Sequence, residues 1–376
     1  MVALAVPRPE EPNSPARPSA HTPFHIPSLD GLRALSFLIV FGAHAGLDWV
    51  IPGGFGVTVF FFLSGYLITT LMRIEAEKTS HVSLKKFYLR RALRILPPFY
   101  IVLLAATTLG VVGFLRSAVP PQPLPVASQI LHFSNYWVAR HGWDGIATGT
   151  SVYWSLAVEE HYYLVAPTVF LGLNRSRLTG WQRACIFWAA CAVVLAWRYV
   201  LVLRFHSNPE RTYLCTDTRF DSIAFGCALA VWHNPVLDAA PTARAESHKW
   251  LWTLLSTGLA LLLITFVLRG PVFRQTLRYS LQGMALTPIF IAAVRWPRAR
   301  PFAPLNWKAV RFIGTLSYSL YLVHEVAFSA VEQHLQLSAP ANAAVALVVS
   351  LAIAWVMYEI VEKPCAALRK RLSEAG

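Results

Sequence analysis

A succession of apolar runs, most of them long enough to cross the hydrocarbon core of a bilayer, constrains this chain more than any other feature. A segment in lipid must satisfy its own backbone hydrogen bonds, which favours helices. Only 14% of the residues are charged, whereas soluble domains carry about a quarter. We therefore predict an all-α, polytopic transmembrane helix bundle. The ten expected spans are 31–49, 55–72, 97–115, 151–173, 182–203, 219–233, 250–268, 280–295, 310–330 and 342–360.

The stretch 124–139 is an eleventh apolar candidate, and the distribution of lysine and arginine argues against counting it as a span. With ten spans and both termini in the cytoplasm, 23 of the 33 Lys and Arg residues fall in cytoplasmic segments and eight fall in outer loops. Such an asymmetry is typical of the positive-inside orientation. We therefore expect 124–139 to form an interfacial or re-entrant helix on the outer side, covered by protein.

Composition also limits the domains and partners. Residues 1–27 hold seven prolines and no long apolar core, which indicates a disordered cytoplasmic tail and not a cleaved signal peptide. We expect 28–364 to form a single membrane domain and 365–376 to form a basic cytoplasmic tail. Topology and anionic lipid account for the net charge of +14, so the expected partner is the bilayer and not nucleic acid. The five cysteines suggest neither a disulfide framework nor a zinc site, and we expect no metal.

Among the ionisable side chains within the expected spans, His44 in the first and Glu159 and Glu160 in the fourth are the first candidates for function. A charge at bilayer depth is costly, so such groups usually face a partner or a wet cavity. If the first span ends near Trp49 and the fourth begins at Ser151, His44 and Glu159 lie about 8 and 12 Å below the outer surface. Glu159 could then orient His44 as a general base for a hydroxyl group. A structural hydrogen bond that satisfies a buried imidazole would explain His44 equally well.

A basic cluster follows the second expected span, where Arg90, Arg91 and Arg94 share one helical face just below the membrane. Guanidinium groups bind phosphate in bidentate fashion, so this face is a candidate site for a phosphorylated cosubstrate. Lipid headgroups would also fit it. Arg33, which precedes His44 by eleven residues, leaves the same choice between anchoring at the membrane edge and contact with an anion.

Glycines at 53, 54 and 56 lead into the second span and favour close helix packing. Ser64 within that span could donate a hydrogen bond into a cavity or back to its own helix. We do not expect Ser64 to act as a nucleophile, because no base lies near it in the sequence.

Polar residues also gather where two later spans approach the outer side. Asp217, Arg219 and Asp221 follow one another closely at the start of the sixth span. They indicate either a local ion pair or a rim that binds a polyol acceptor. Tyr321 and His324 share one side of the ninth span, and His324 could line the same outer vestibule as His44 or simply lie at the interface.

Taken together, these segments resemble the membrane acyltransferase-3 family, and they occur in family order across about 28–364. The matching segments are Ser28-Leu-Asp30-Gly31-Leu-Arg33-Ala with His44 after a ten-residue gap; Phe60-Phe-Phe-Leu-Ser64-Gly65-Tyr66-Leu-Ile; Arg91-Ala-Leu-Arg94-Ile-Leu-Pro97; Trp154-Ser155-Leu156-Ala-Val-Glu159-Glu160-His-Tyr-Tyr163; Arg219-Phe-Asp221; and Ser317-Tyr318-Ser-Leu-Tyr321-Leu-Val-His324.

The resemblance implies transfer of an acyl group, usually acetyl, from cytoplasmic acyl-coenzyme A as cosubstrate to a hydroxyl group in or beyond the membrane. It implies a catalytic role for His44, and the residues themselves suggest Glu159 and Glu160 as its catalytic partners. The family's Arg-x10-His and Arg-x-x-Arg patterns fall on Arg33 with His44 and on Arg91 with Arg94.

From their positions in the sequence we also expect Arg90 and Ser64 at the donor site. The acceptor site would contain Trp154, Asp217, Arg219, Asp221, Tyr321 and His324. We expect a multi-pass protein of the cell inner or plasma membrane, and no help from the esterase-like domain that some members carry.

The acceptor remains open between a cell-envelope carbohydrate or glycolipid, a small secreted metabolite such as a macrolide, and peptidoglycan. A proton-coupled secondary transporter is the main alternative from another class, because ten spans with buried His and Glu would suit it. Such transporters often show paired repeats with broken helices, which this sequence lacks. A non-catalytic lipid-binding or assembly protein would leave the polar groups inside the membrane unexplained.

Overall fold

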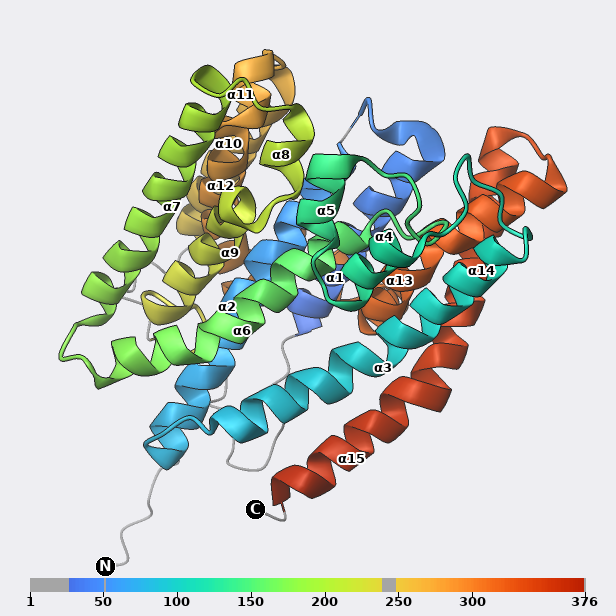
Figure 1. Cartoon of the computed structure of the whole chain (residues 1–376). Coiled ribbons are helices and arrows are strands. Elements are labelled where there is room, and N and C mark those ends of the chain that lie inside the picture. The colour runs from blue at the N-terminus through green and yellow to red at the C-terminus, as the bar shows by residue number, and fades with distance from the viewer. Residues whose placement is uncertain (1–26, 51, 239–247, 375–376) are drawn as a thin grey trace, which may run out of the picture.

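The computed structural model describes residues 27–50, 52–238 and 248–374, so most of the expected N-terminal tail lies outside the described residues. Figure 1 shows a bundle of helices, and no strand occurs in the described part of the chain. The two ends of this bundle are named here after the elements that lie at them. The η1 end carries the widened turn η1 (Ala43–Leu47) with α8 (Pro209–Leu214) and α11 (Pro271–Gln275); the α15 end carries α15 (Lys363–Glu374) and the turn between α2 and α3.

Each of the ten expected spans coincides with a helix. These helices are α1 (Pro27–Gly42), α2 (Gly53–Thr79), α3 (Leu84–Val111), α6 (Tyr153–Arg175), α7 (Gly180–Leu203), α9 (Thr216–Val231), α10 (His248–Val267), α12 (Leu277–Arg295), α13 (Lys308–Leu335) and α14 (Ala339–Met357). The prediction of an all-α polytopic bundle is therefore confirmed.

Among the described residues, seven helices are long and apolar enough to cross a membrane by themselves. α6, α9 and α13 are not among them, for reasons that their sequences make plain. α9 has only 16 residues, α6 carries two adjacent glutamates, and α13 carries charged residues along its length. Ten spans is therefore an approximate count, and these three helices depend on their neighbours for burial of polar groups.

The stretch 124–139 forms two short helices where one was expected. α4 (Pro123–Ile130) and α5 (Ser134–His141) are separated by a turn in which His132 has a φ of 52°. Protein covers the polar groups here. Gln129 is buried and donates to the Thr150 hydroxyl at 2.7 Å, and buried Asn135 donates to the Thr216 hydroxyl at 2.9 Å. The non-helical backbone therefore lies against the bundle.

α2 runs through the middle of the bundle (Figure 1). It packs closely against α9, backbone to backbone. A methyl group added to Gly65 would overlap the carbonyl oxygen of Ile223, and one added to Gly226 would overlap that of Phe62. Small residues allow this approach between helices in a membrane, where hydrophobic burial supplies little attraction. Gly56 also serves close packing, as expected from the sequence, because a methyl group added to it would overlap the backbone of α1.

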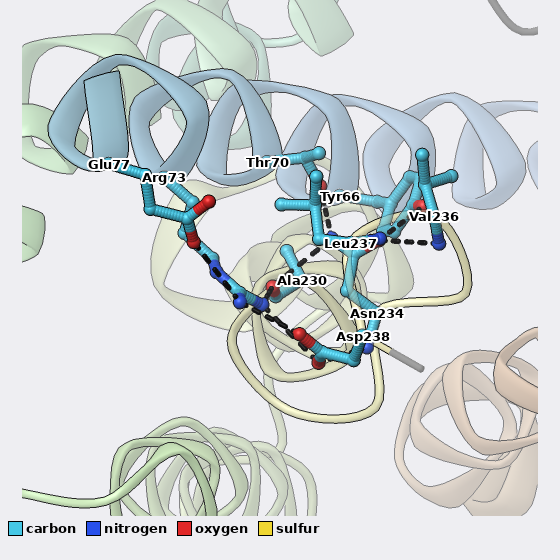
Figure 2. A network of polar contacts seen from close by, with 9 residues as sticks. All are labelled: Tyr66, Thr70, Arg73, Glu77, Ala230, Asn234, Val236, Leu237 and Asp238. Atoms are coloured by element: carbon cyan, nitrogen blue, oxygen red, sulfur yellow. Dashed lines mark hydrogen bonds and ion pairs between the residues drawn. The ribbon is translucent and has the colours of Figure 1, made fainter. Parts of the chain in front are cut away.

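A polar network joins the end of α9 to α2 (Figure 2). The fully buried Asn234 accepts from the Tyr66 hydroxyl at 3.0 Å and donates to the Thr70 hydroxyl at 2.8 Å. Its side-chain oxygen also accepts from the backbone of Val236 at 3.0 Å. Beside it, Arg73 pairs with Asp238 at 2.8 Å. The side-chain amide of Asn234 therefore satisfies polar groups of α2, of α9 and of the turn that follows α9.

We expect Asn234→Leu to destabilise the protein by about 2–3 kcal/mol, because it leaves the buried Tyr66 and Thr70 hydroxyl groups without their partner. Thermal unfolding of the purified protein in detergent would measure the change. Asn174→Leu is a suitable control, because Asn174 is half-buried and makes no hydrogen bond with a described residue. Equal stability of the two variants would contradict a structural role for the network.

Candidate active site

A cavity of about 310 Å³ lies among α1, α2, α3, α6 and α13. Its α2 lining runs from Val57 to Leu71, fourteen residues apart in sequence, which corresponds to about 21 Å along a helix. It is therefore an elongated passage and not a round pocket. Its polar lining is Asp30, Arg33, Ser64, Arg91, Arg94, Ser155, Glu159, Glu160, Tyr163, Ser317, Tyr318 and Tyr321.

Three of the four predicted donor-site arginines line this cavity. Arg33 donates to Asp30 at 3.1 Å, whereas Arg91 and Arg94 make no hydrogen bond or ion pair with a described residue. Arg91 lies 5.9 Å from the centre of the Tyr163 ring. Two guanidinium groups near the α15 end therefore have donors available for an anion.

Arg90 does not line the cavity. Its guanidinium pairs with Glu75 of α2 at 2.5 Å. The shared helical face that the sequence suggested for Arg90, Arg91 and Arg94 is therefore divided in the structure, because a carboxylate on the neighbouring helix holds the first of the three.

Ser64 and Glu159 meet inside the cavity. The Ser64 hydroxyl donates to Glu159 Oε1 at 2.5 Å and accepts from the Tyr163 hydroxyl at 3.2 Å. Glu160 lines the same cavity without a hydrogen bond to a described residue. A carboxylate therefore lies beside Ser64 in space, although no base lies near it in the sequence. Their separation of 95 residues in sequence hid this contact.

The expected pairing of His44 with Glu159 is not formed among the described residues. α1 ends at Gly42, and His44 lies exposed in η1, whose Gly46 has a φ of 88°. The estimate from sequence extended this span to Trp49, two residues beyond the candidate membrane span Pro27–Leu47. Ser151, at the start of the α6 region, bonds to Glu325, the neighbour of His324. His44 therefore lies level with the start of α6, and Glu159 lies eight residues deeper, about 12 Å away along the helix.

The ring beside His44 is that of His324, with the two ring centres 5.3 Å apart. His324 is fully buried, and its ring centre lies 5.6 Å from that of Tyr321, which lines the cavity. The predicted proximity of His44 and His324 is thus observed. Tyr321 lies at the end of the cavity, and the His324 ring lies beside both Tyr321 and His44.

A model of the acyltransferase-3 family, described as an acyltransferase domain, matches residues 26–359. The chain belongs to the acyltransferase-3 family. The resemblance noted from the sequence motifs is thereby confirmed. The chain carries an acyltransferase domain of this family, and its long apolar helices support a multi-pass membrane protein.

Several curated relatives are similar to this acyltransferase-3 chain. A peptidoglycan O-acetyltransferase of Listeria monocytogenes is 29% identical over 350 residues, which cover 90% of this chain and 56% of the relative. A putative peptidoglycan O-acetyltransferase of Bacillus subtilis is 29% identical over 355 residues, with 90% and 55% covered. A putative O-acetyltransferase of Staphylococcus aureus is 27% identical over 319 residues, with 82% and 52% covered.

The chain therefore spans about half the length of the curated relatives it matches. No solved structure matches it.

Two acyltransferase-3 motif residues expected at an acceptor rim are buried instead. Asp221 is fully buried and pairs with Arg198 of α7 through both carboxylate oxygens, at 3.0 and 2.6 Å. Arg219 is also fully buried, with its guanidinium 4.2 Å from the centre of the Tyr279 ring. The expectation of an exposed rim at these two positions is not met, because both side chains turn into the bundle and find partners on other helices. The sequence did indicate that Arg198 has an ionic partner, because an arginine within an apolar span needs one.

The remaining acceptor candidates lie near the η1 end. Asp217 is half-buried and accepts from Arg211, Trp197 and Tyr136. Burial and the negative charge of Asp217 raise the pKa of Tyr136 to about 12, so its hydroxyl stays protonated at neutral pH and can donate. Trp154 is buried and packs against Tyr213, with ring centres 4.7 Å apart, outside the cavity lining.

Three further side chains that line the cavity had no individual role predicted from the sequence: Ser155, Tyr163 and Tyr318. Each lies within a segment that carried the resemblance, and that position was the available signal. Ser155 hydrogen-bonds to the Tyr321 hydroxyl at 2.7 Å, and Tyr318 donates to the backbone of α3 at 2.8 Å. These hydroxyl groups make the cavity wall polar at several depths.

Proposed function

We propose that this chain is a membrane O-acyltransferase that moves an acyl group, most simply acetyl, from cytoplasmic acyl-coenzyme A to a hydroxyl group of a cell-envelope carbohydrate or glycolipid. The observation that carries the proposal is the elongated cavity, with unpaired arginines at one end and Tyr321 at the other. The names of the relatives favour an envelope polymer such as peptidoglycan as the acceptor.

The arginine end would face the cytoplasm, in agreement with the distribution of lysine and arginine. Arg91 and Arg94 would bind the phosphate groups of the donor, and Arg33, paired with Asp30, would add positive charge deeper in the cavity. The thioester arm would extend along the cavity towards Tyr321. The charged part of the coenzyme would then never cross the membrane, which avoids the cost of moving phosphate charges through lipid.

His44 would act as general base at the η1 end. It would take the proton of the acceptor hydroxyl while the oxygen attacks the thioester carbonyl carbon, and the carbon–sulfur bond would break as the coenzyme leaves as a thiol. The acyl group would reach the acceptor in one step. The pair Ser64–Glu159 is the alternative, because a serine beside a carboxylate is an arrangement suited to a covalent intermediate.

Purified protein in liposomes, supplied with labelled acetyl-coenzyme A and envelope glycans, should transfer label and release free thiol. A transporter would move solute without releasing thiol, so thiol release separates the two functions. Label that stays on the protein when acceptor is omitted, at Ser64 or elsewhere, would count against direct transfer. Absence of both transfer and thiol release would contradict the proposed function.

We expect Arg91→Ala and Arg94→Ala each to raise the KM for acetyl-coenzyme A about tenfold or more. A hydrogen bond to a charged group contributes about 1.5–3 kcal/mol, and about 1.4 kcal/mol corresponds to a tenfold change in affinity. Initial rates at varied donor concentration would measure this. Lys85→Ala is the matched control, because Lys85 is an exposed cation on the same helix outside the cavity. An unchanged KM in both arginine variants would place the donor site elsewhere.

A further inference from the structure

His324 has one ring nitrogen that is buried and unpaired. Its Nδ1 lies 2.9 Å from the carbonyl oxygen of Tyr321 and 3.2 Å from that of Leu320. A carbonyl oxygen only accepts, so Nδ1 must carry the proton, and in the neutral ring Nε2 is then an acceptor. Nε2 is buried and has no hydrogen-bond partner among the described residues. A buried acceptor without a partner is unfavourable, so a donor should be available to it.

The rings that surround His324 narrow the choice of donor. Phe37 and Phe41 of α1 lie with their ring centres 5.6 and 6.3 Å from that of His324, and neither carries a donor. The Tyr321 hydroxyl is already bonded to Ser155. His44 is the remaining ring, and it makes no hydrogen bond with a described residue.

The distance between the two imidazoles suits a direct hydrogen bond. An N–H···N bond of about 3 Å between two imidazole edges places the ring centres about 5 Å apart, and the observed separation is 5.3 Å. His44 is exposed in the turn η1, so its ring can rotate to direct an N–H at Nε2 of His324, whose own orientation is fixed by two backbone carbonyls.

We propose that His324 is the positioning residue for His44. Its Nε2 accepts the N–H of one His44 nitrogen, which leaves the other His44 nitrogen unprotonated and directed at the acceptor hydroxyl. This is the role that the sequence suggested for Glu159. The inference rests on the proposed function, because it assigns a partner to the proposed base. A neutral imidazole stabilises a neighbouring cation less than a carboxylate does, so the contribution of His324 is mainly the choice of tautomer and orientation.

Two substitutions at His324 separate this role from packing. His324→Phe keeps an aromatic ring and removes the acceptor. We expect kcat to fall roughly tenfold to a hundredfold in this variant, which is part of the rate acceleration of about 10²–10⁴-fold that a general base contributes. The KM for acetyl-coenzyme A should not change, because the arginines lie at the other end of the cavity. His324→Gln, whose side-chain oxygen can accept near the position of Nε2, should retain more of kcat than His324→Phe.

Nitrogen NMR of protein labelled at histidine supplies a readout that does not depend on activity. The signals of His44 are identified by their loss in His44→Ala. The wild type should show one predominant tautomer of His44, and His324→Phe should show a mixture. An unchanged tautomer in His324→Phe, or a kcat no lower in that variant than in His324→Gln, would overturn the inference. If the wild type transfers no acyl group from acetyl-coenzyme A, the proposed function fails, and the tautomer measurement still decides whether His324 positions His44.

Discussion

Acyl transfer is expected to be abolished by His44→Ala, while the protein still inserts and accumulates in membranes. A general base accelerates a reaction about 10²–10⁴-fold, and the methyl side chain of alanine cannot take the proton of the acceptor hydroxyl. The structural cost should be small, because His44 is exposed and its recorded ring contact is with His324. Transfer of labelled acetyl in membrane preparations, normalised to the amount of protein by immunoblot, would measure the effect.

His141→Ala is a matched control for this variant. His141 is an exposed histidine on α5 whose ring also packs on one aromatic neighbour, Trp137, with ring centres 4.3 Å apart. It lies outside the cavity and should retain full transfer. Near wild-type transfer by His44→Ala would reassign the base, and Glu159 beside Ser64 would become the next candidate.

The spans could be predicted from sequence because membrane burial imposes one local requirement, a sufficiently long apolar helix. That requirement does not say where a helix stops. α1 gives way to η1 after Gly42, and a positive φ at Gly46 marks the change, so the apolar run continues beyond the regular helix. The estimate for His44 took the span to run to Trp49, whereas the candidate membrane span ends at Leu47. The same limitation applied to 124–139, where a turn at His132 divides the run into two helices.

Contacts between helices were harder to predict than the helices themselves. The arginines at the cavity could be expected from their helical spacing, but Glu75 removes Arg90 from that set, and Glu75 lies on another helix. The Ser64–Glu159 hydrogen bond likewise joins α2 to α6. Side-chain identity shows that a polar group in a membrane needs a partner, whereas the packing of the helices decides which partner it receives.

The ion pair between Arg198 and Asp221 illustrates how such a partner stabilises the bundle. Both side chains are fully buried, and Arg198 also donates to the Thr218 carbonyl and the Ser280 hydroxyl, each at 2.6 Å. Ser280 in turn donates to Asp221 at 2.7 Å. The network connects the end of α7 to the beginnings of α9 and α12, and both charged side chains are fully buried there.

We expect Asp221→Ala to destabilise the protein by about 3–5 kcal/mol, because it leaves the Arg198 guanidinium buried without its counter-charge. Thermal unfolding in detergent and the amount of protein in membranes would both report the loss. The double variant Arg198→Met with Asp221→Ala removes both charges and should recover much of the stability, since a buried ion pair replaced by apolar groups often costs little. If the double variant were no more stable than Asp221→Ala, the unpaired charge would not be the cause, and the loss would instead reflect the packing of Asp221 itself.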